Sequence, residues 1–169
     1  KESQIANFTN EGGIEHRFRF LKNYMGMWLF QNIRRNLGKT LTYDEMMYEA
    51  KSSEKYYYID VNAQDFVAPD NMIDAIKNYL NKPDMTLGEV INTVYHSLAK
   101  SYKSAMDEIE AISKTEIDTI YIVGGGSKDE YLCALTEEYT GKKVVTGAVE
   151  TTALGNIISQ FYTKNGEYT

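Results

Sequence analysis

The sequence predicts an α/β fold of one domain, in which a parallel or mixed sheet is flanked by helices. The first observation is that the last third of the chain alternates strand-like segments (117–123 and 143–146) with helix-like segments (128–139 and 150–162). Short strands separated by such helices imply parallel β-α-β pairing. The second is an apolar face at helical spacing from residue 90 to residue 112, which predicts one long helix packed across the sheet. A chain of 169 residues is long enough for one domain with a buried core.

Local signals define the remaining elements. Thr86 opens the long helix with the S/T-x-x-E spacing of a capping box. Thr42 has the character of an N-cap for a helix over 43–50, and Gly38 that of a C-cap after a helix over 17–37. The other expected elements are strands at 5–8 and 56–61, a turn at 9–13 and a helix at 71–80.

The composition is ordinary for a globular protein, with 43% hydrophobic and 25% charged residues. The net charge of −6 argues against a general nucleic-acid binder or an anionic-membrane binder, because both need clustered Lys and Arg. No apolar run approaches the ~20 residues that span a bilayer, and we expect no signal peptide. These features predict a cytoplasmic protein with neither nucleic acid nor a membrane as its partner.

The chain has one cysteine and two histidines, and none of them has the spacing of a metal site. Cys133 lies on a predicted amphipathic helix, where we expect a small buried residue and not a nucleophile. A lone cysteine also suits a reducing compartment. His16 and His96 stand 80 positions apart and are interpreted as structural or solvated. The sequence therefore predicts no metal ligand.

The most informative segment is Gly124-Gly125-Gly126, which follows an apolar strand and precedes a helix. Glycines let a ligand approach the backbone, and a helix N-terminus beyond them supplies unpaired amides. The G-x-x-x-x-G-K-[ST] and G-x-G-x-x-G phosphate motifs are absent. Because Asp129 and Glu130 lie in the first helical turn, we expect contact near the nucleoside or its first phosphate. The alternative is a tight strand-to-helix turn with Ser127 as its N-cap.

A second candidate element lies on the helix expected over 17–37. At 100° per residue Asn23, Met27 and Gln31 span about 80° of arc, with Arg34 between them. Amide side chains on such a stripe can hydrogen-bond ribose hydroxyls or a base edge without a charge cost. The alternative is a solvated helix face.

These segments resemble the bacterial rhamnulokinases, a family within the FGGY carbohydrate kinases, over nearly the whole chain. The blocks that carry the resemblance are Asn7-Phe8-Thr9-Asn10-Glu11-Gly12-Gly13, Arg19-Phe20-Leu21-Lys22-Asn23-Tyr24-Met25-Gly26-Met27-Trp28, Ile122-Val123-Gly124-Gly125-Gly126-Ser127 and Gly147-Ala148-Val149-Glu150-Thr151-Thr152-Ala153-Leu154-Gly155-Asn156. The glycine turn is shared with other FGGY kinases, whereas the first two blocks are more specific. Ala148 departs from the family's proline, which should alter only loop rigidity.

The resemblance implies a ribonuclease-H-like (actin-like ATPase) domain that lacks its first strands. Residues 1–169 would be the C-terminal nucleotide-binding domain of an FGGY sugar kinase. The resemblance assigns contacts with ATP or ADP to Asn23, Gln31 and Gly125, and Gly124 and Gly126 complete the turn.

The family reaction transfers the γ-phosphoryl group of Mg-ATP to the 1-hydroxyl of L-rhamnulose. In the family, the catalytic base and most sugar contacts precede the region where this sequence begins, in an N-terminal sugar-binding domain. The resemblance therefore implies no catalytic residue in this chain, no activity of this chain alone, and a sugar substrate reached through the missing domain.

Three other interpretations stay open. The parent kinase could prefer L-fuculose or D-xylulose, because the sugar pocket lies outside this sequence. The chain could also be a non-catalytic nucleotide-binding or interaction domain of the same fold, which a substituted catalytic aspartate upstream would indicate. The third is an α/β domain without a nucleotide site.

Overall fold

The computed structural model describes residues 8–13, 17–23 and 26–164. His16 and most of the strand predicted at 5–8 lie outside the described residues. In chain order the elements are β1 (Thr9–Gly12), β2 (Phe18–Leu21), α2 (Trp28–Asn36), α3 (Tyr43–Lys51), η2 (Gln64–Phe66), α4 (Met72–Tyr79), α5 (Leu87–Ser113), β3 (Thr119–Ile122), η3 (Gly124–Lys128), α6 (Glu130–Thr140), β4 (Lys143–Thr146) and α7 (Thr151–Lys164).

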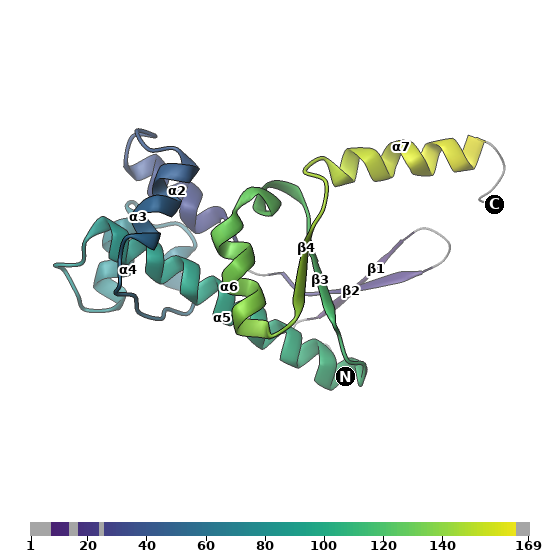
Figure 1. The fold of residues 1–169 in the computed structure, drawn as a ribbon, viewed down its shortest axis with the longest axis horizontal. Helices are drawn as coiled ribbons and strands as arrows, with labels where there is room; N and C mark the ends of the chain where they lie inside the picture. The colour runs from purple at the N-terminus through teal and green to yellow at the C-terminus, as the bar shows by residue number, and fades with distance from the viewer. Residues whose placement is uncertain (1–7, 14–16, 24–25, 165–169) are drawn as a thin grey trace.

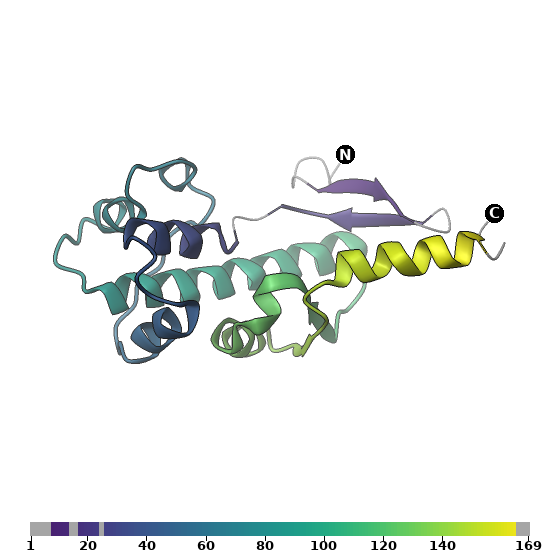
Figure 2. The ribbon, with the colours of Figure 1, turned by 90° about the horizontal axis from the view of Figure 1, so that it is seen from above.

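Helix α5 is the axis of the molecule (Figures 1 and 2). Helices α2, α3 and α4 gather around its first half, α6 packs along its middle, and the β3–β4 pair lies beyond α6. The core forms where these helices meet, and its fully buried side chains include Phe30, Met46, Met72, Ile76 and Leu98. Cys133 on α6 is also buried, as predicted, and burial raises the pKa of its thiol.

The sequence determines where α5 begins and how closely it packs. The Glu89 N–H donates to Thr86 Oγ1 at 3.2 Å and the Thr86 N–H donates to the Glu89 carboxylate at 2.7 Å, which confirms the predicted capping box. Gly88 lies in the first turn against α3, where an added Cβ would stand 2.8 Å from the carbonyl oxygen of Glu49. Helices α3 and α5 therefore approach each other more closely than an alanine permits.

Other helix signals are also confirmed. Thr42 caps α3 with a second capping box, and Gly38 follows α2 with φ +64°. The helix predicted at 71–80 is α4, and its N-cap is Asn71. Helices α6 and α7 lie within two residues of their predicted bounds.

The described strands form two separate two-stranded sheets, whereas the sequence predicted one sheet. Strands β3 and β4 pair in parallel, with Ile120 opposite Val144, and α6 makes the crossover between them. This confirms the predicted β-α-β unit. Strands β1 and β2 form an antiparallel hairpin.

The hairpin corrects two sequence predictions. Residues 9–12 are a strand and not part of a turn, and residues 18–21 are a strand and not the first turns of a helix. The helix predicted over 17–37 begins only at Trp28. Pairing with β1, together with the stacking of Phe8 on Phe20 at 4.4 Å between ring centroids, outweighs the local helical period.

Residues 56–61 were predicted as a strand, but residues 56–60 have no regular secondary structure, Val61 lies in a turn, and none of them pairs with a strand among the described residues. Their amides bond to hydroxyls of α5 instead, Tyr57 N–H to Thr93 Oγ1 at 3.1 Å and Ile59 N–H to Ser97 Oγ at 3.0 Å. Thr93 and Ser97 stand about one helical turn apart on α5, so successive turns of the helix bind alternate amides of this segment. Hydroxyls of α5 therefore satisfy two amides that a neighbouring strand would otherwise have bound.

His96 on α5 contacts both this segment, through Tyr56, and α6, through Tyr139. Its ring stacks on Tyr56 with 3.5 Å between centroids, and its Nδ1 lies 2.7 Å from the hydroxyl of Tyr139. Burial lowers the pKa of His96, and the charge of Glu138 opposes that effect. This histidine is structural, in agreement with one of the two roles expected for it.

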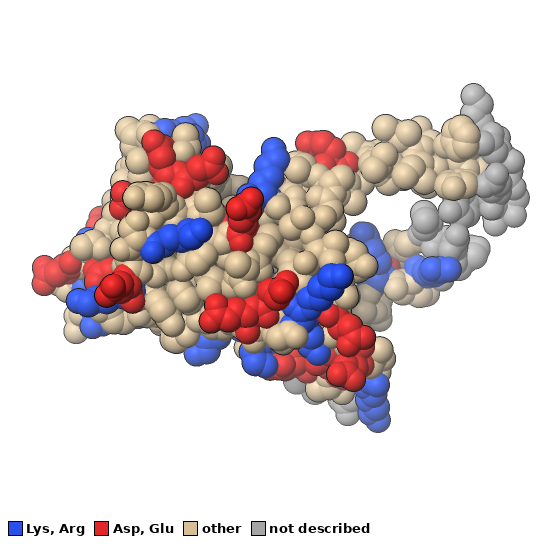
Figure 3. All heavy atoms as spheres, viewed as in Figure 1, with Lys and Arg blue, Asp and Glu red and all other residues tan. Residues whose placement is uncertain are grey.

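Helix α7 extends away from the end of β4 (Figure 1). Leu154, Ile157 and Phe161 are exposed on it, and its visible surface carries few charged side chains (Figure 3). No described helix is both long enough and apolar enough to cross a membrane.

We expect Gly88→Ala to destabilise the fold by about 1–3 kcal/mol, because the new methyl group meets backbone of α3 that cannot rotate away. Urea denaturation measures the effect. Gly155→Ala on α7 is the matched control, since a Cβ there meets no atom within 4 Å. The control should be neutral or stabilising by up to about 1 kcal/mol through helix propensity. Equal stabilities for the two variants would contradict the close packing.

His96 makes the fold sensitive to acid. Its folded pKa lies below the ordinary value of about 6.5, so the unfolded chain binds more protons as pH falls through that value. The contribution of neutral His96 is complete above about pH 6.5 and declines below it, by at most about 1.4 kcal/mol per pH unit. Denaturant titrations at pH 7.5 and 5.5 should therefore show a smaller acid loss for His96→Gln than for the parent. If both proteins lose the same stability between pH 7.5 and 5.5, this role of His96 is excluded.

Candidate functional site

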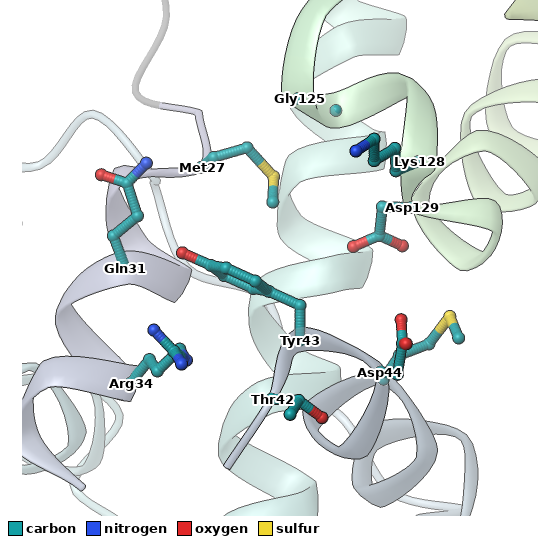
Figure 4. Close-up of a pocket in the computed structure, with 11 residues that line it drawn as sticks. Met27, Gln31, Arg34, Thr42, Tyr43, Asp44, Gly125, Lys128 and Asp129 are labelled. Carbon is teal, nitrogen blue, oxygen red and sulfur yellow. The ribbon is translucent and has the colours of Figure 1, made fainter. Parts of the chain in front are cut away.

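One cavity of about 750 Å³ lies between α2, the start of α3 and the glycine turn (Figure 4). Volumes of about 300–1,000 Å³ are typical of small-molecule sites. Its described lining residues are Met27, Gln31, Arg34, Thr42, Tyr43, Asp44, Met47, Gly125, Gly126, Lys128 and Asp129. The cavity therefore joins two segments that lie about ninety residues apart in the chain.

The glycine turn differs in detail from the sequence prediction. Residues Gly124–Lys128 form one short 3-10 helix, and α6 begins after it with Asp129 as N-cap. Ser127 was the cap in the alternative interpretation, but its hydroxyl donates to the carbonyl oxygen of Gly124 at 2.7 Å. Only Gly124 has a positive φ, +76°, so the backbone itself calls for glycine at that position.

Gly125 has a different reason to be glycine. Its φ is not in the left-handed region, and a Cβ added to it would meet no protein atom within 4 Å. Gly126 is nearly as open, with only Ile122 Cγ2 at 3.9 Å. Packing does not require glycine at these two positions, and both line the cavity. The bare backbone at Gly125 leaves room for a molecule outside the fold.

Asp129 is fixed by two hydrogen bonds, one to each carboxylate oxygen. Leu132 N–H donates to Oδ1 at 3.0 Å, and the hydroxyl of Tyr95 on α5 donates to Oδ2 at 2.7 Å. Burial and the neighbouring Asp129 charge raise the pKa of Tyr95 far above its ordinary value, so the hydroxyl remains a donor. The cavity wall is thereby anchored to the central helix, and the first amides of α6 are capped by a carboxylate.

The α2 wall contains part of the predicted polar stripe. Gln31 and Met27 line the cavity, as does Arg34, whose Nε donates to the carbonyl oxygen of Leu41 at 2.7 Å. Asn23 is exposed, lies between β2 and α2, and is not among the residues that line the cavity. The stripe is shorter than predicted because α2 begins only at Trp28, so Asn23 is not on the helix.

The structure thus brings Gln31, Gly125 and Gly126 together and leaves Asn23 and Gly124 outside the lining. The sequence prediction missed the third wall, Thr42, Tyr43 and Asp44. Thr42 was recognised as a helix cap, but no motif in the sequence connects this helix start with a glycine turn eighty residues later.

The charges in the cavity are mixed. Asp44, Asp129 and Lys128 lie on one side of Tyr43, and Arg34 lies on the other (Figure 4). Among the described residues, no group of three or more His, Cys, Asp or Glu side chains is placed to hold a metal ion.

Comparison with known proteins defines the class. Residues 2–163 match the profile of the FGGY family of carbohydrate kinases, C-terminal domain, and the chain belongs to this family. Domains of this family have the ribonuclease-H-like, actin-like fold, and the observed helices flanking small parallel and antiparallel sheets agree with this class.

Several similar curated proteins are named rhamnulokinase. The one from Oceanobacillus iheyensis is 42% identical over 158 residues, which are 91% of this chain and 34% of that protein. The one from Halalkalibacterium halodurans is 40% identical over 92% of this chain and 34% of its own length. The Bacillus subtilis protein is 36% identical over 91% and 33%. These matches confirm the resemblance seen in the sequence blocks, and the chain spans about a third of the relatives' length.

The anchoring of Asp129 gives a prediction. Tyr95→Phe keeps the ring against Phe30 but removes the donor to a carboxylate, a bond that typically contributes about 1.5–3 kcal/mol. We expect the free energy of unfolding to fall by about 1–3 kcal/mol in urea titrations. Tyr48→Phe, a tyrosine that is 72% exposed on α3, should leave the stability unchanged. If the free energy of unfolding of Tyr95→Phe equals that of the parent, the bond does not hold the turn.

Proposed function

We propose that this chain is the ATP-binding part of a sugar kinase that phosphorylates L-rhamnulose to L-rhamnulose 1-phosphate with Mg-ATP. Residues 1–169 would form one C-terminal nucleotide-binding domain of that kinase. The observation that carries the proposal is that a single cavity is lined by both Gln31 and the open backbone at Gly125. The relatives' shared name supports the reaction and the sugar.

The cavity suits the nucleoside end of the nucleotide. Gln31 offers an amide that can both donate to and accept from a base edge or a ribose hydroxyl. Asp44 and Asp129 would repel phosphates placed against them, and Asp129 already caps α6. The β- and γ-phosphates would therefore leave the cavity past Lys128, toward the part of the kinase that holds the sugar.

The chemistry would lie outside this chain. Phosphoryl transfer needs positioning of the sugar hydroxyl and charge stabilisation around the γ-phosphate. Mg²⁺ typically binds through phosphates, waters and one or two carboxylates, so it fits a site completed by the nucleotide and the rest of the kinase. The base that accepts the sugar proton would precede this chain, and the chain alone would be inactive. The lone thiol of Cys133 supports a reducing, cytoplasmic location.

The ribonuclease-H-like sheet would be completed by strands that this sequence lacks. A groove of about 430 Å³ lies beside β3 and above α5, and its lining includes Ile120, Ile122, Tyr102, Ala105 and Met106. Among the described residues β3 pairs only with β4, and β1 only with β2. An additional strand between the two pairs would cover these apolar side chains and satisfy the open edge.

Sugar specificity is tested with the complete natural polypeptide that contains these residues. The proposal expects ATP turnover with L-rhamnulose to exceed turnover with L-fuculose and D-xylulose. If another of these sugars is preferred, the proposed kinase activity stands and the proposed substrate is wrong. Absence of turnover with retained ADP binding would instead indicate a non-catalytic domain.

ADP titration of the same polypeptide tests the nucleotide site. Gly125→Val should weaken binding about 10- to 100-fold, because its methyl groups fill space that the ligand needs. Gln31→Ala should weaken binding about 3- to 10-fold through one lost hydrogen bond, and Asn23→Ala by a similar factor if the family role holds. Gly12→Val in β1 is the matched control, since its Cβ also meets nothing within 4 Å. Normal ADP binding by all three variants would refute the site.

A further inference from the structure

Tyr43 is a partly exposed aromatic side chain at the wall of the large cavity. It is 43% exposed at the start of α3, and among the described residues that line the large cavity it carries the only aromatic ring. Tyr43, Gln31 and Arg34 also line a second hollow of about 330 Å³. The ring therefore stands between two open spaces and projects toward Met27 and Gln31 (Figure 4).

Arg34 holds the ring in place. Its guanidinium lies over the ring of Tyr43, with Cζ 5.3 Å from the centroid, and its Nε donates to the carbonyl oxygen of Leu41 at 2.7 Å. Leu41 lies in the connection between α2 and α3, so this single arginine fixes both the loop and the ring. A side chain held in this way loses little conformational freedom when a ligand stacks on it.

We propose that Tyr43 is the stacking surface for the base of the nucleotide, and that Arg34 is the residue that positions it. This inference rests on the proposed function and adds to it a residue that favours a purine over a smaller pyrimidine. Across the cavity from the ring lie the thioether of Met27 and the open backbone of Gly125 (Figure 4). An aromatic face, a thioether and bare peptide groups form a slot suited to a flat, uncharged ring.

The carboxylates beside Tyr43 favour the base over the phosphates on the α3 side of the cavity, and the Arg34 guanidinium is engaged with the ring and with the carbonyl oxygen of Leu41. Asp44 follows Tyr43 on α3, and Asp129 faces the same space. Two carboxylates repel a phosphate but accept hydrogen bonds from an exocyclic amino group or a ribose hydroxyl. Lys128, the cation on the glycine-turn side, is the better neighbour for a phosphate.

The experiment measures ADP and UDP affinity of the complete natural polypeptide by calorimetry. Tyr43→Ala should weaken ADP binding about 10-fold, as expected for loss of one base–aromatic stack. It should also reduce the preference for ADP over UDP, because the larger purine loses more stacking area. Tyr43→Phe should retain both values. Tyr48→Ala, an exposed tyrosine on the same helix outside the cavity, should match the parent.

Arg34 is tested through its dependence on Tyr43. Arg34→Ala should weaken ADP binding in the parent and have little further effect in the Tyr43→Ala background, because it acts through the ring. Melting temperatures of all variants check that each one folds.

Two outcomes overturn the inference: parent-like ADP binding by Tyr43→Ala, or equal losses for ADP and UDP. If Gly125→Val and Gln31→Ala lose ADP while Tyr43→Ala does not, the nucleotide site stands and only the stacking role fails. If none of the variants changes ADP binding, the proposed function itself fails.

Discussion

The hydrogen bond between Tyr95 and Asp129 connects the helical core to the glycine turn that forms one wall of the candidate site. Tyr95 is buried in the first half of α5, where α2, α3 and α4 form the core, and Asp129 stands at the junction of the glycine turn and α6. Without a donor from α5, Asp129 would keep only its contact with its own helix. Because the cavity needs the glycine turn to face α2 and α3 at a fixed separation, this bond sets the geometry of the candidate site.

Sequence reasoning succeeded where a signal was local and strong. The capping boxes at Thr42 and Thr86 and the parallel unit of β3, α6 and β4 all follow from patterns within a few residues. It failed where tertiary partners decide, since the pairing of β2 with β1 replaced a plausible helical period, and hydroxyls of α5 replaced a neighbouring strand for residues 56–61. The strand predicted at 56–61 did not form, and two of its amides bond to α5.

The candidate site shows the same division. Gln31 and Gly125 were selected from a polar stripe and a glycine run, and the fold brings both to one cavity. Tyr43 carries no such signal, because a single exposed tyrosine after a helix cap is common on protein surfaces. Its role depends on Arg34 and on a turn eighty residues later, and only the folded chain places these together.

The separation in sequence of the cavity walls has a thermodynamic consequence. Residues 27–47 and 125–129 meet only in the folded chain, so a ligand bound between them has no counterpart site in the unfolded chain. Occupancy and folding are then linked, and each tenfold rise in free ligand above its dissociation constant adds about 1.4 kcal/mol to stability. The folded chain would therefore be most stable, and most resistant to proteolysis, when the ligand is abundant.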